Sequence, residues 1–256
     1  MKKNERGRMR GQGAPVASLV LLALVGTLVP LASAAPSGAA SITHSASRLL
    51  AQSKGAAQKS GSMRFTDRST SGKETESLSG AISAKAAGES LTATGSDPLE
   101  VLLVGHTIYL QASAQILQSA LDLPAEAAAA ESGKWISMQS GDSAFATLAD
   151  ELTVTSELNT YVPASHLKVG KEIKVAGHKV IPITGQPSAA AANGATSGSA
   201  ALLVSPKSPY LPVGGTLILS KTGSSELKEV AIFGEWGKSV SLSAPTGAVS
   251  FDSLAG

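Results

Sequence analysis

Gly141-Asp142-Ser143 is the stretch of this chain whose residue types most suggest catalysis, because in one large class of serine hydrolases this tripeptide introduces the nucleophile. A serine nucleophile needs a base, which in hydrolases of this motif is a histidine near the C-terminus, three residues after an aspartate. Neither of the later histidines, His166 and His178, has an acid at that position. We therefore expect a turn in which Asp142 caps a following helix, and not a catalytic Ser143.

Other short motifs are incomplete. Lys221-Thr222-Gly223 and Ser225-Glu226-Leu227-Lys228 resemble two elements of the penicillin-binding enzymes, but in those enzymes the Ser-x-x-Lys element comes first and far upstream. Gly237-Lys238-Ser239 ends like a phosphate-binding loop, but Ile232 stands where that loop requires its first glycine. These stretches therefore predict neither a hydrolase nor a nucleotide-binding protein.

The remaining titratable residues show no spacing typical of a reactive site. No short metal-ligand spacing separates the four histidines, which are His44, His106, His166 and His178. Asp150 and Glu151 are adjacent on a predicted helix, where neighbouring side chains point apart, so they do not form a catalytic pair. The sequence therefore predicts a protein that is not an enzyme, with no catalytic residue, no cofactor and no metal.

The N-terminus has the pattern of a secretory signal peptide. Residues 1–10 hold five basic residues and one acid, and an uncharged apolar run over 16–31 leads to the small-residue exit Ala32-Ser33-Ala34. The run is short for a membrane span, so we expect cleavage near Ala34, a retained leader being the alternative. One domain over 35–256 would remain.

Cleavage would also change the charge. Without residues 1–34, Lys+Arg falls from 21 to 16 and Asp+Glu from 19 to 18, so the net charge becomes −2 instead of +2. This balance gives no reason to expect nucleic acid as a partner. The chain has no cysteine, which excludes disulfides and a cysteine-linked lipid anchor. We expect a secreted, extracytoplasmic, soluble domain that is stabilised by its core.

Hydrophobic periodicity predicts where helices and strands lie. Helical spacing over 42–58 gives way to period-two alternation over 62–111, which indicates a meander of antiparallel strands. Helices are expected over 114–132, with a break at Pro124, and from Asp142 towards Tyr161. The further strands are expected over 134–139, 171–175, 179–183, 201–205, 216–220, 227–233 and 239–243, with a flexible loop over 187–199. About ten strands and three or four helices in this order predict an α+β fold, in which an antiparallel sheet carries helices on one face.

Aliphatic residues dominate the predicted strands, while aromatic residues make up only 4% of the chain. Alanine-rich helices over such a sheet can close a dry core or leave an apolar cavity, because alanine fills little volume. The residues leave both outcomes open. Alternation along the strands and helices suggests these ligand-lining candidates: Leu102, Val104, Ile108, Leu110, Trp135, Phe145, Leu148, Leu202, Val204, Leu217, Leu219 and Phe233.

Several weak motifs follow one another in an order that resembles a known group of proteins. They are VLLVGHTIYL at 101–110, GKWI at 133–136, VAGHKVIPITG at 175–185, ALLVSP at 201–206 and FGEWGKSVSLSAP at 233–245. Their succession, over roughly 42–251, resembles the actinobacterial exported and lipoprotein families related to the mycobacterial LppX and LprG lipid carriers. These in turn are similar to the periplasmic lipoprotein carrier LolA.

The resemblance implies a strongly curved antiparallel sheet, a half-barrel, with helices on its concave face and an apolar cavity that takes acyl chains. It also implies that VLLVGHTIYL and GKWI form neighbouring strands, and that Phe233, Trp236 and SVSLSAP lie at the far edge of the sheet. We expect a secreted, non-enzymatic protein that binds a lipid or another hydrophobic ligand, with a membrane surface or an envelope protein as a further partner. The alternative is a cell-envelope sensor or interaction module with a closed core and no ligand.

Overall fold

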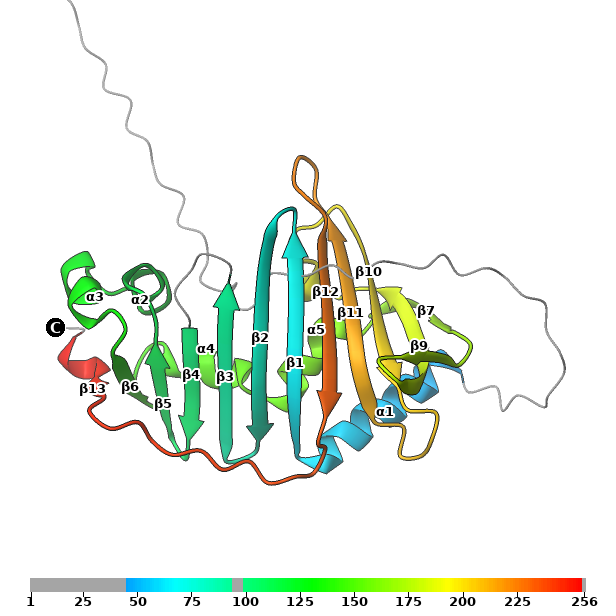
Figure 1. Cartoon of the computed structure of the whole chain (residues 1–256), viewed down its shortest axis with the longest axis horizontal. Coiled ribbons are helices and arrows are strands. Elements are labelled where there is room, and N and C mark those ends of the chain that lie inside the picture. Colours follow the sequence, from blue (N-terminus) through cyan, green and yellow to red (C-terminus); the bar gives the residue numbers. More distant parts are fainter. Residues whose placement is uncertain (1–44, 94–98, 255–256) are drawn as a thin grey trace, which may run out of the picture.

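Period-two alternation in the sequence becomes one large curved sheet in the computed structural model, which describes residues 45–93 and 99–254 (Figure 1). The expected signal peptide over 1–34 and the first residues of the helix predicted over 42–58 lie outside the described residues. Helices pack against one face of the sheet, so the predicted α+β class and curved sheet are confirmed.

The described residues form thirteen strands and six α-helices, followed by a 3-10 helix at Phe251–Ser253. The strands are β1 (Ser62–Ser71), β2 (Glu74–Ser83), β3 (Ala86–Ala93), β4 (Leu99–Val104), β5 (Thr107–Gln111), β6 (Trp135–Gln139), β7 (Ser165–Val169), β8 (Ile173–Val175), β9 (His178–Gln186), β10 (Ser197–Val204), β11 (Pro212–Ser220), β12 (Leu227–Gly234) and β13 (Val249–Ser250). The helices are α1 (Ala46–Ser60), α2 (Ala114–Leu121), α3 (Ala125–Glu131), α4 (Phe145–Glu151), α5 (Val154–Tyr161) and α6 (Ala189–Ala192).

Two meanders meet in the middle of the sheet. β1 to β6 pair in sequence order on one side and β9 to β12 on the other, and β1 joins them by pairing with β12. The order is β13-β6-β5-β4-β3-β2-β1-β12-β11-β10-β9-β7, with β8 paired to β9 outside this path. The pairs are antiparallel except for β13 with β6. β4, β5 and β6 are neighbours, as the resemblance implied.

Three expectations about strands and loops are wrong. β12, which holds Phe233, lies between β1 and β11 and not at the edge of the sheet. Residues 239–243 form no strand, because the chain there runs past the ends of the strands instead of along a neighbour. The segment 187–199 is not simply a loop, because α6 and the start of β10 lie within it.

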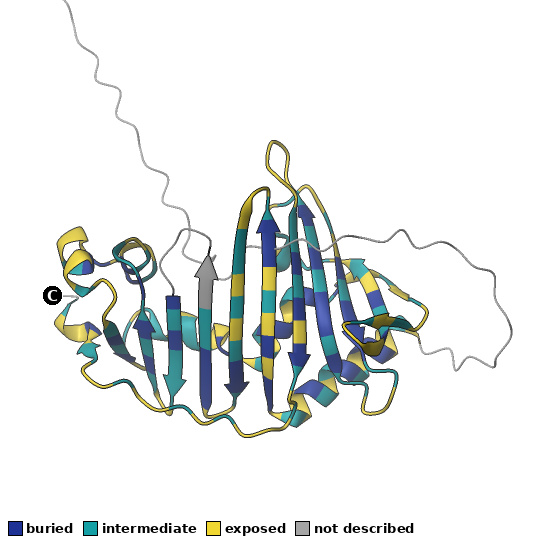
Figure 2. Ribbon diagram, viewed as in Figure 1, coloured by how far each residue is buried: buried dark blue, intermediate teal, exposed yellow. Residues whose placement is uncertain are grey.

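Alternation along the strands separates a buried face from a more exposed one (Figure 2). On β1, Met63 and Phe65 are buried while Arg64 and Thr66 are exposed. The buried side faces α1, α4 and α5, because Leu49 of α1, Leu158 of α5 and Leu152, which directly follows α4, belong to the same hydrophobic core. The core therefore lies between the sheet and these helices.

Local signals explain where the helices begin and end. The Ser45 side chain accepts a hydrogen bond from Arg48 N at 3.3 Å at the start of α1, and the helix ends at Gly61 with a φ of 71°. Thr153 caps α5 in the same way, since its hydroxyl accepts from Ser156 N at 3.0 Å. The predicted break at Pro124 separates α2 from α3.

Asp142 does not have the predicted role. It does not cap α4, which begins at Phe145 without a side-chain cap. Its Oδ2 instead accepts a hydrogen bond from Gln139 N at 2.6 Å and so holds the turn that follows β6. The helix starts two residues later than the sequence suggested, because the Asp142 side chain bonds to the preceding Gln139 and not to the first N–H groups of a helix.

Residues 235–248, which we call the C-terminal strap, run along one end of the strands from β12 towards β6 (Figure 1). The strap begins with Trp236, whose Nε1 donates to the Pro212 carbonyl at 2.9 Å. Ser62 Oγ then donates to the Lys238 carbonyl at 2.7 Å. Further along, Leu242 lies over Gly88, where an added Cβ would be 3.0 Å from Leu242 Cδ1. The strap is therefore held at several points along its course.

Candidate functional site

Most of the predicted lining residues lie in the core, on the side of the sheet that faces the helices. Seven strand residues are buried there, and they are Ile108, Leu110, Leu202, Val204, Leu217, Leu219 and Phe233. Phe145 and Leu148 of α4 are partly buried and pack against the same cluster. The alternation chosen for β5, β10, β11 and β12 therefore selects the helix-facing side.

Three predicted lining residues lie on the opposite side of the sheet. In the β4–β5 hairpin, Leu103 is opposite Ile108 and Val104 is opposite Thr107. Because the alternation continues across the two-residue turn, Leu102 and Val104 point away from the face that holds Ile108. Trp135 is opposite Gln111 on that outer face as well. The expected face was wrong for Leu102 and Val104 because the turn set a register that the sequence alternation did not reveal. It was also wrong for Trp135, whose neighbour Ile136 is the residue that shares a face with Leu110.

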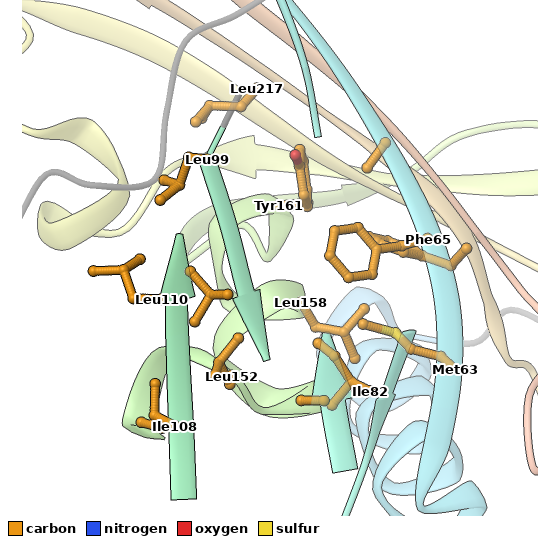
Figure 3. Close-up of a cluster of buried hydrophobic side chains, with 14 of the residues drawn as sticks. Met63, Phe65, Ile82, Leu99, Ile108, Leu110, Leu152, Leu158, Tyr161 and Leu217 are labelled. Carbon is orange, nitrogen blue, oxygen red and sulfur yellow. The ribbon is translucent and has the colours of Figure 1, made fainter. Parts of the chain in front are cut away.

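Aromatic residues connect α5 to the centre of the sheet. The rings of Tyr161 and Phe233 meet edge to face with centroids 5.7 Å apart, and Trp236 meets Phe233 at 6.5 Å. Figure 3 shows Leu158 and Tyr161 of α5 near Met63 and Phe65 of β1. The Tyr161 side chain, at the end of α5, therefore contacts β12 through Phe233 and β1 through Asp67.

Four acidic side chains, which we call the carboxyl cluster, interact within this apolar setting. They come from four elements: Asp67 of β1, Glu89 of β3, Glu157 of α5 and Glu229 of β12. On the strands, Asp67 is in phase with Phe65, and Glu229 is in phase with Phe233. Both acids therefore share the helix-facing side of the sheet with the core.

Burial is the main reason that the cluster resists ionisation. It raises the pKa of Glu229 to about 9, and the nearby Asp67 carboxyl contributes in the same direction. Burial likewise raises the pKa of Asp67 and of Glu89 to about 7 each. The pKa of Glu157 is raised well above its usual value, first by burial and then by the neighbouring acids. Near pH 7 much of the cluster is therefore protonated.

Several oxygen atoms of the cluster lack hydrogen-bond partners within the part of the chain that the structure describes. Glu229 is 1% exposed and Glu157 is 7% exposed, yet both oxygens of Glu229 and Oε1 of Glu157 are buried without a partner. Asp67 accepts from the Tyr161 hydroxyl through Oδ2, but its Oδ1 is also unpartnered. Native proteins leave few buried polar atoms in this state, so these oxygens require an explanation.

Asp67 and Glu89 differ from the two buried glutamates in one respect. Both keep part of their surface accessible, although burial is the largest cause of their raised pKa. Protein therefore surrounds these two carboxyls on most sides without sealing them completely. A small group that reached them would enter a largely enclosed, apolar environment.

The residues first considered for catalysis are not brought together. Ser143 is exposed in the turn before α4, and the described hydrogen bonds join His166 Nδ1 to Ser165 and Gln186 instead. Among the described residues, no group of three or more potential ligands is placed to hold a metal ion. No helix in the described ranges has the length and apolar character needed to span a bilayer.

Reasoning from the sequence missed the carboxyl cluster, although the sequence contained a signal for part of it. Glu157 occupies the apolar stripe of α5, three residues after Val154 and one before Leu158. Asp67 and Glu229 stand in phase with inward-facing residues of their strands. An acid that keeps the period of the core is the pattern that marks a buried carboxyl.

No family model matches this sequence, and no curated protein matches it either. Among solved structures, the chain is similar to LprF from Mycobacterium bovis, with 13% sequence identity and a TM-score of 0.49. The alignment covers 79% of this chain and 97% of LprF. The fold and the carboxyl cluster described above come from this chain's own structure and do not depend on that likeness.

Proposed function

We propose that this protein binds a hydrophobic ligand, such as the acyl chains of a lipid, between its curved sheet and helices α4 and α5. One observation carries the proposal: the buried oxygens of Glu157 and Glu229 have no partner among the described residues. An unpartnered buried polar atom costs about 1–3 kcal/mol. A ligand or water molecule that enters the site and donates to these oxygens would remove that cost.

The surroundings favour a ligand that is mainly apolar. The helix-facing side of the sheet is lined by aliphatic and aromatic residues such as Phe65, Ile82 and Leu217. Binding would shield a hydrocarbon chain from water, which stabilises the complex by about 0.8 kcal/mol per buried CH₂. This function needs no covalent step. The leader pattern over 1–34 supports an extracytoplasmic place of action.

The closed-core alternative is favoured by a different observation. Ile108, Leu110 and Leu217 are at most 1% exposed, so these candidate lining residues are already covered by the protein itself. A core of this kind fits an envelope sensor or interaction module without a ligand. The two functions differ in whether a hydrophobic probe can bind.

Leu78 offers a test of the binding function. It lies opposite Asp67 in the β1–β2 pair, is partly buried and packs against the core. Replacing it by a polar residue, Leu78→Gln, should weaken the binding of a fluorescent fatty-acyl probe by about tenfold, since burial of a leucine contributes about 1.5–3 kcal/mol. Ile232→Gln is the matched control, because Ile232 is 46% exposed and should leave probe binding unchanged.

Mass spectrometry of an organic extract of the purified protein completes the test. We expect lipids or other hydrophobic molecules in the extract and probe binding by the unaltered protein. An empty extract together with absence of probe binding would refute the proposal and favour the closed-core module. Equal weakening by both substitutions would show that the probe does not bind beside Asp67.

A further inference from the structure

The carboxyl cluster gathers groups that become negative when they ionise. Glu157 interacts with Asp67, Glu89 and Glu229, and Glu151 at the end of α4 also raises the pKa of Glu157 and of Glu89. Ion pairs at the surface join Glu235 to Arg64 and Lys238, Lys134 to Glu131, and Lys179 to Glu172. The chain thus places several acids where a positive charge would be stabilised.

The helices do not direct a basic residue to the cluster through the contacts that the structure describes. Lys54 of α1 reaches α5, but its Nζ donates to Asn159 Oδ1 at 3.3 Å. Outside the described residues, lysine and arginine occur only within 1–10, which belong to the expected leader. If a cation completes the cluster, a bound molecule is its most direct source.

We propose that the ligand is an amphiphile with a protonated amine, whose hydrocarbon chain lies against the aliphatic face while its amine lies at the carboxyl cluster. This inference rests on the proposed function. An ammonium group carries three N–H donors and a positive charge, and both oxygens of the buried Glu229 have no partner among the described residues.

The same geometry selects against other headgroups. A carboxylate or phosphate would bring a negative charge close to Asp67 and Glu89, whose pKa values of about 7 leave them partly ionised at neutral pH, and like charges in a medium of low polarity repel strongly. A hydroxyl could donate one hydrogen bond but would bring no charge. A metal ion is a poorer candidate, because the described residues include no group of ligands placed to hold one. The order of affinity should therefore be amine, alcohol, acid.

Binding of an amine should also release protons. A nearby positive charge favours the ionised form of a carboxyl and lowers its pKa. Glu229, with a pKa of about 9 in the free protein, is protonated at pH 7. It should give up its proton when the ammonium group arrives, and Tyr161 should keep Asp67 in place through its hydroxyl.

The experiment compares three probes that share a sixteen-carbon chain: hexadecylamine, hexadecanol and hexadecanoic acid. Each displaces a fluorescent acyl probe from the purified protein at pH 7. We expect the amine to bind at least about tenfold more tightly than the alcohol, since hydrogen bonds to charged groups are among the stronger ones. Calorimetry in two buffers with different ionisation enthalpies should show release of about one proton with the amine alone.

Glu229→Gln provides the decisive variant, because glutamine keeps the shape of the side chain but cannot ionise. It should lower the ratio of amine to alcohol affinity severalfold and reduce proton release. Glu235→Gln alters an exposed acid in a surface ion pair and should leave the ratio unchanged.

The outcomes separate this inference from the function on which it rests. Binding of all three probes with equal affinity, or an unchanged ratio in Glu229→Gln, would refute the amine preference and leave hydrophobic binding intact. Binding of none of the three would refute the proposed function and the inference together. A preference for hexadecanoic acid would likewise refute the amine preference and leave hydrophobic binding intact.

Discussion

Glu229→Gln should make the protein more stable at neutral pH. Burial raises the pKa of Glu229 from 4.5 to about 9 in the folded protein. The stabilisation associated with its protonated form is therefore complete below pH 4.5 and is lost as the pH rises towards 9. Each pH unit in this window costs about 1.4 kcal/mol. Between pH 4.5 and 7 the loss is about 3 kcal/mol, which a glutamine at the same position would avoid.

Urea denaturation at pH 5 and pH 7 measures this effect. We expect the unaltered protein to lose about 2.5 kcal/mol between the two values because of Glu229, and the variant to lose markedly less. Asp67 and Glu89, whose pKa values are raised to about 7, act in the same direction and should leave part of the slope in the variant.

Glu235→Gln is the matched control for this experiment. Glu235 is exposed at the surface, and the hydrogen bond and charge of Lys238 lower its pKa, with Arg64 contributing further. Removal of the Glu235 charge should lower the free energy of unfolding slightly. It should not reduce the loss of stability between pH 5 and pH 7. The reasoning would be refuted by a stability that rises from pH 5 to pH 7, or by equal slopes in Glu229→Gln and the unaltered protein.

Other substitutions test single contacts by the same denaturation assay. Tyr161→Phe should cost about 1–2 kcal/mol, because Asp67 would lose its hydroxyl donor; an unchanged stability would mean that this hydrogen bond contributes nothing. Gly80→Ala should cost about 1–3 kcal/mol, because its Cβ would lie 2.6 Å from Cε1 of the inward-facing Phe65 ring. Gly234→Ala is its control, since no atom lies within 4 Å there, and equal losses would contradict the packing argument. Ser143→Ala should change stability by less than about 0.5 kcal/mol, and a hydrolase activity that disappears with it would revive the catalytic interpretation.

Local features of this fold could be predicted from the sequence. The hairpin of β4 and β5 follows from aliphatic alternation on both sides of Gly105, and the separation of α2 from α3 follows from Pro124. These elements are specified by a few neighbouring residues, so their signals survive without knowledge of the rest of the chain.

The central pairing of the sheet could not be predicted in this way. β1 pairs with β12 over a separation of more than 150 residues, with Phe65 opposite Phe233. The sequence pattern of neither strand identifies its pairing partner, because many strands of this chain share the same alternation. The same limit explains the wrong place given to β12 and the missed β7, whose residues are mostly exposed.

The candidate site was only partly predictable for a related reason. The inward faces of β5, β10 and β11 followed from alternation, but the face of β4 depended on the register of its turn. The carboxyl cluster depends on both the β1–β12 pairing and the position of α5. Its members can thus be recognised in the sequence one by one, as acids in phase with the core. That they lie close together can be seen only in the folded structure.

The C-terminal strap also acts as a tether of limited reach. Fully extended, residues 235–248 span at most about 50 Å, whereas the six strand-to-strand steps from β12 to β6 measure about 29 Å at the usual spacing. The strap therefore has spare length, and its contacts with Ser62 and Gly88 hold it in place. The spare length would allow the curved sheet to flatten. The strap would still limit the distance between β6 and β12 to its own extended length.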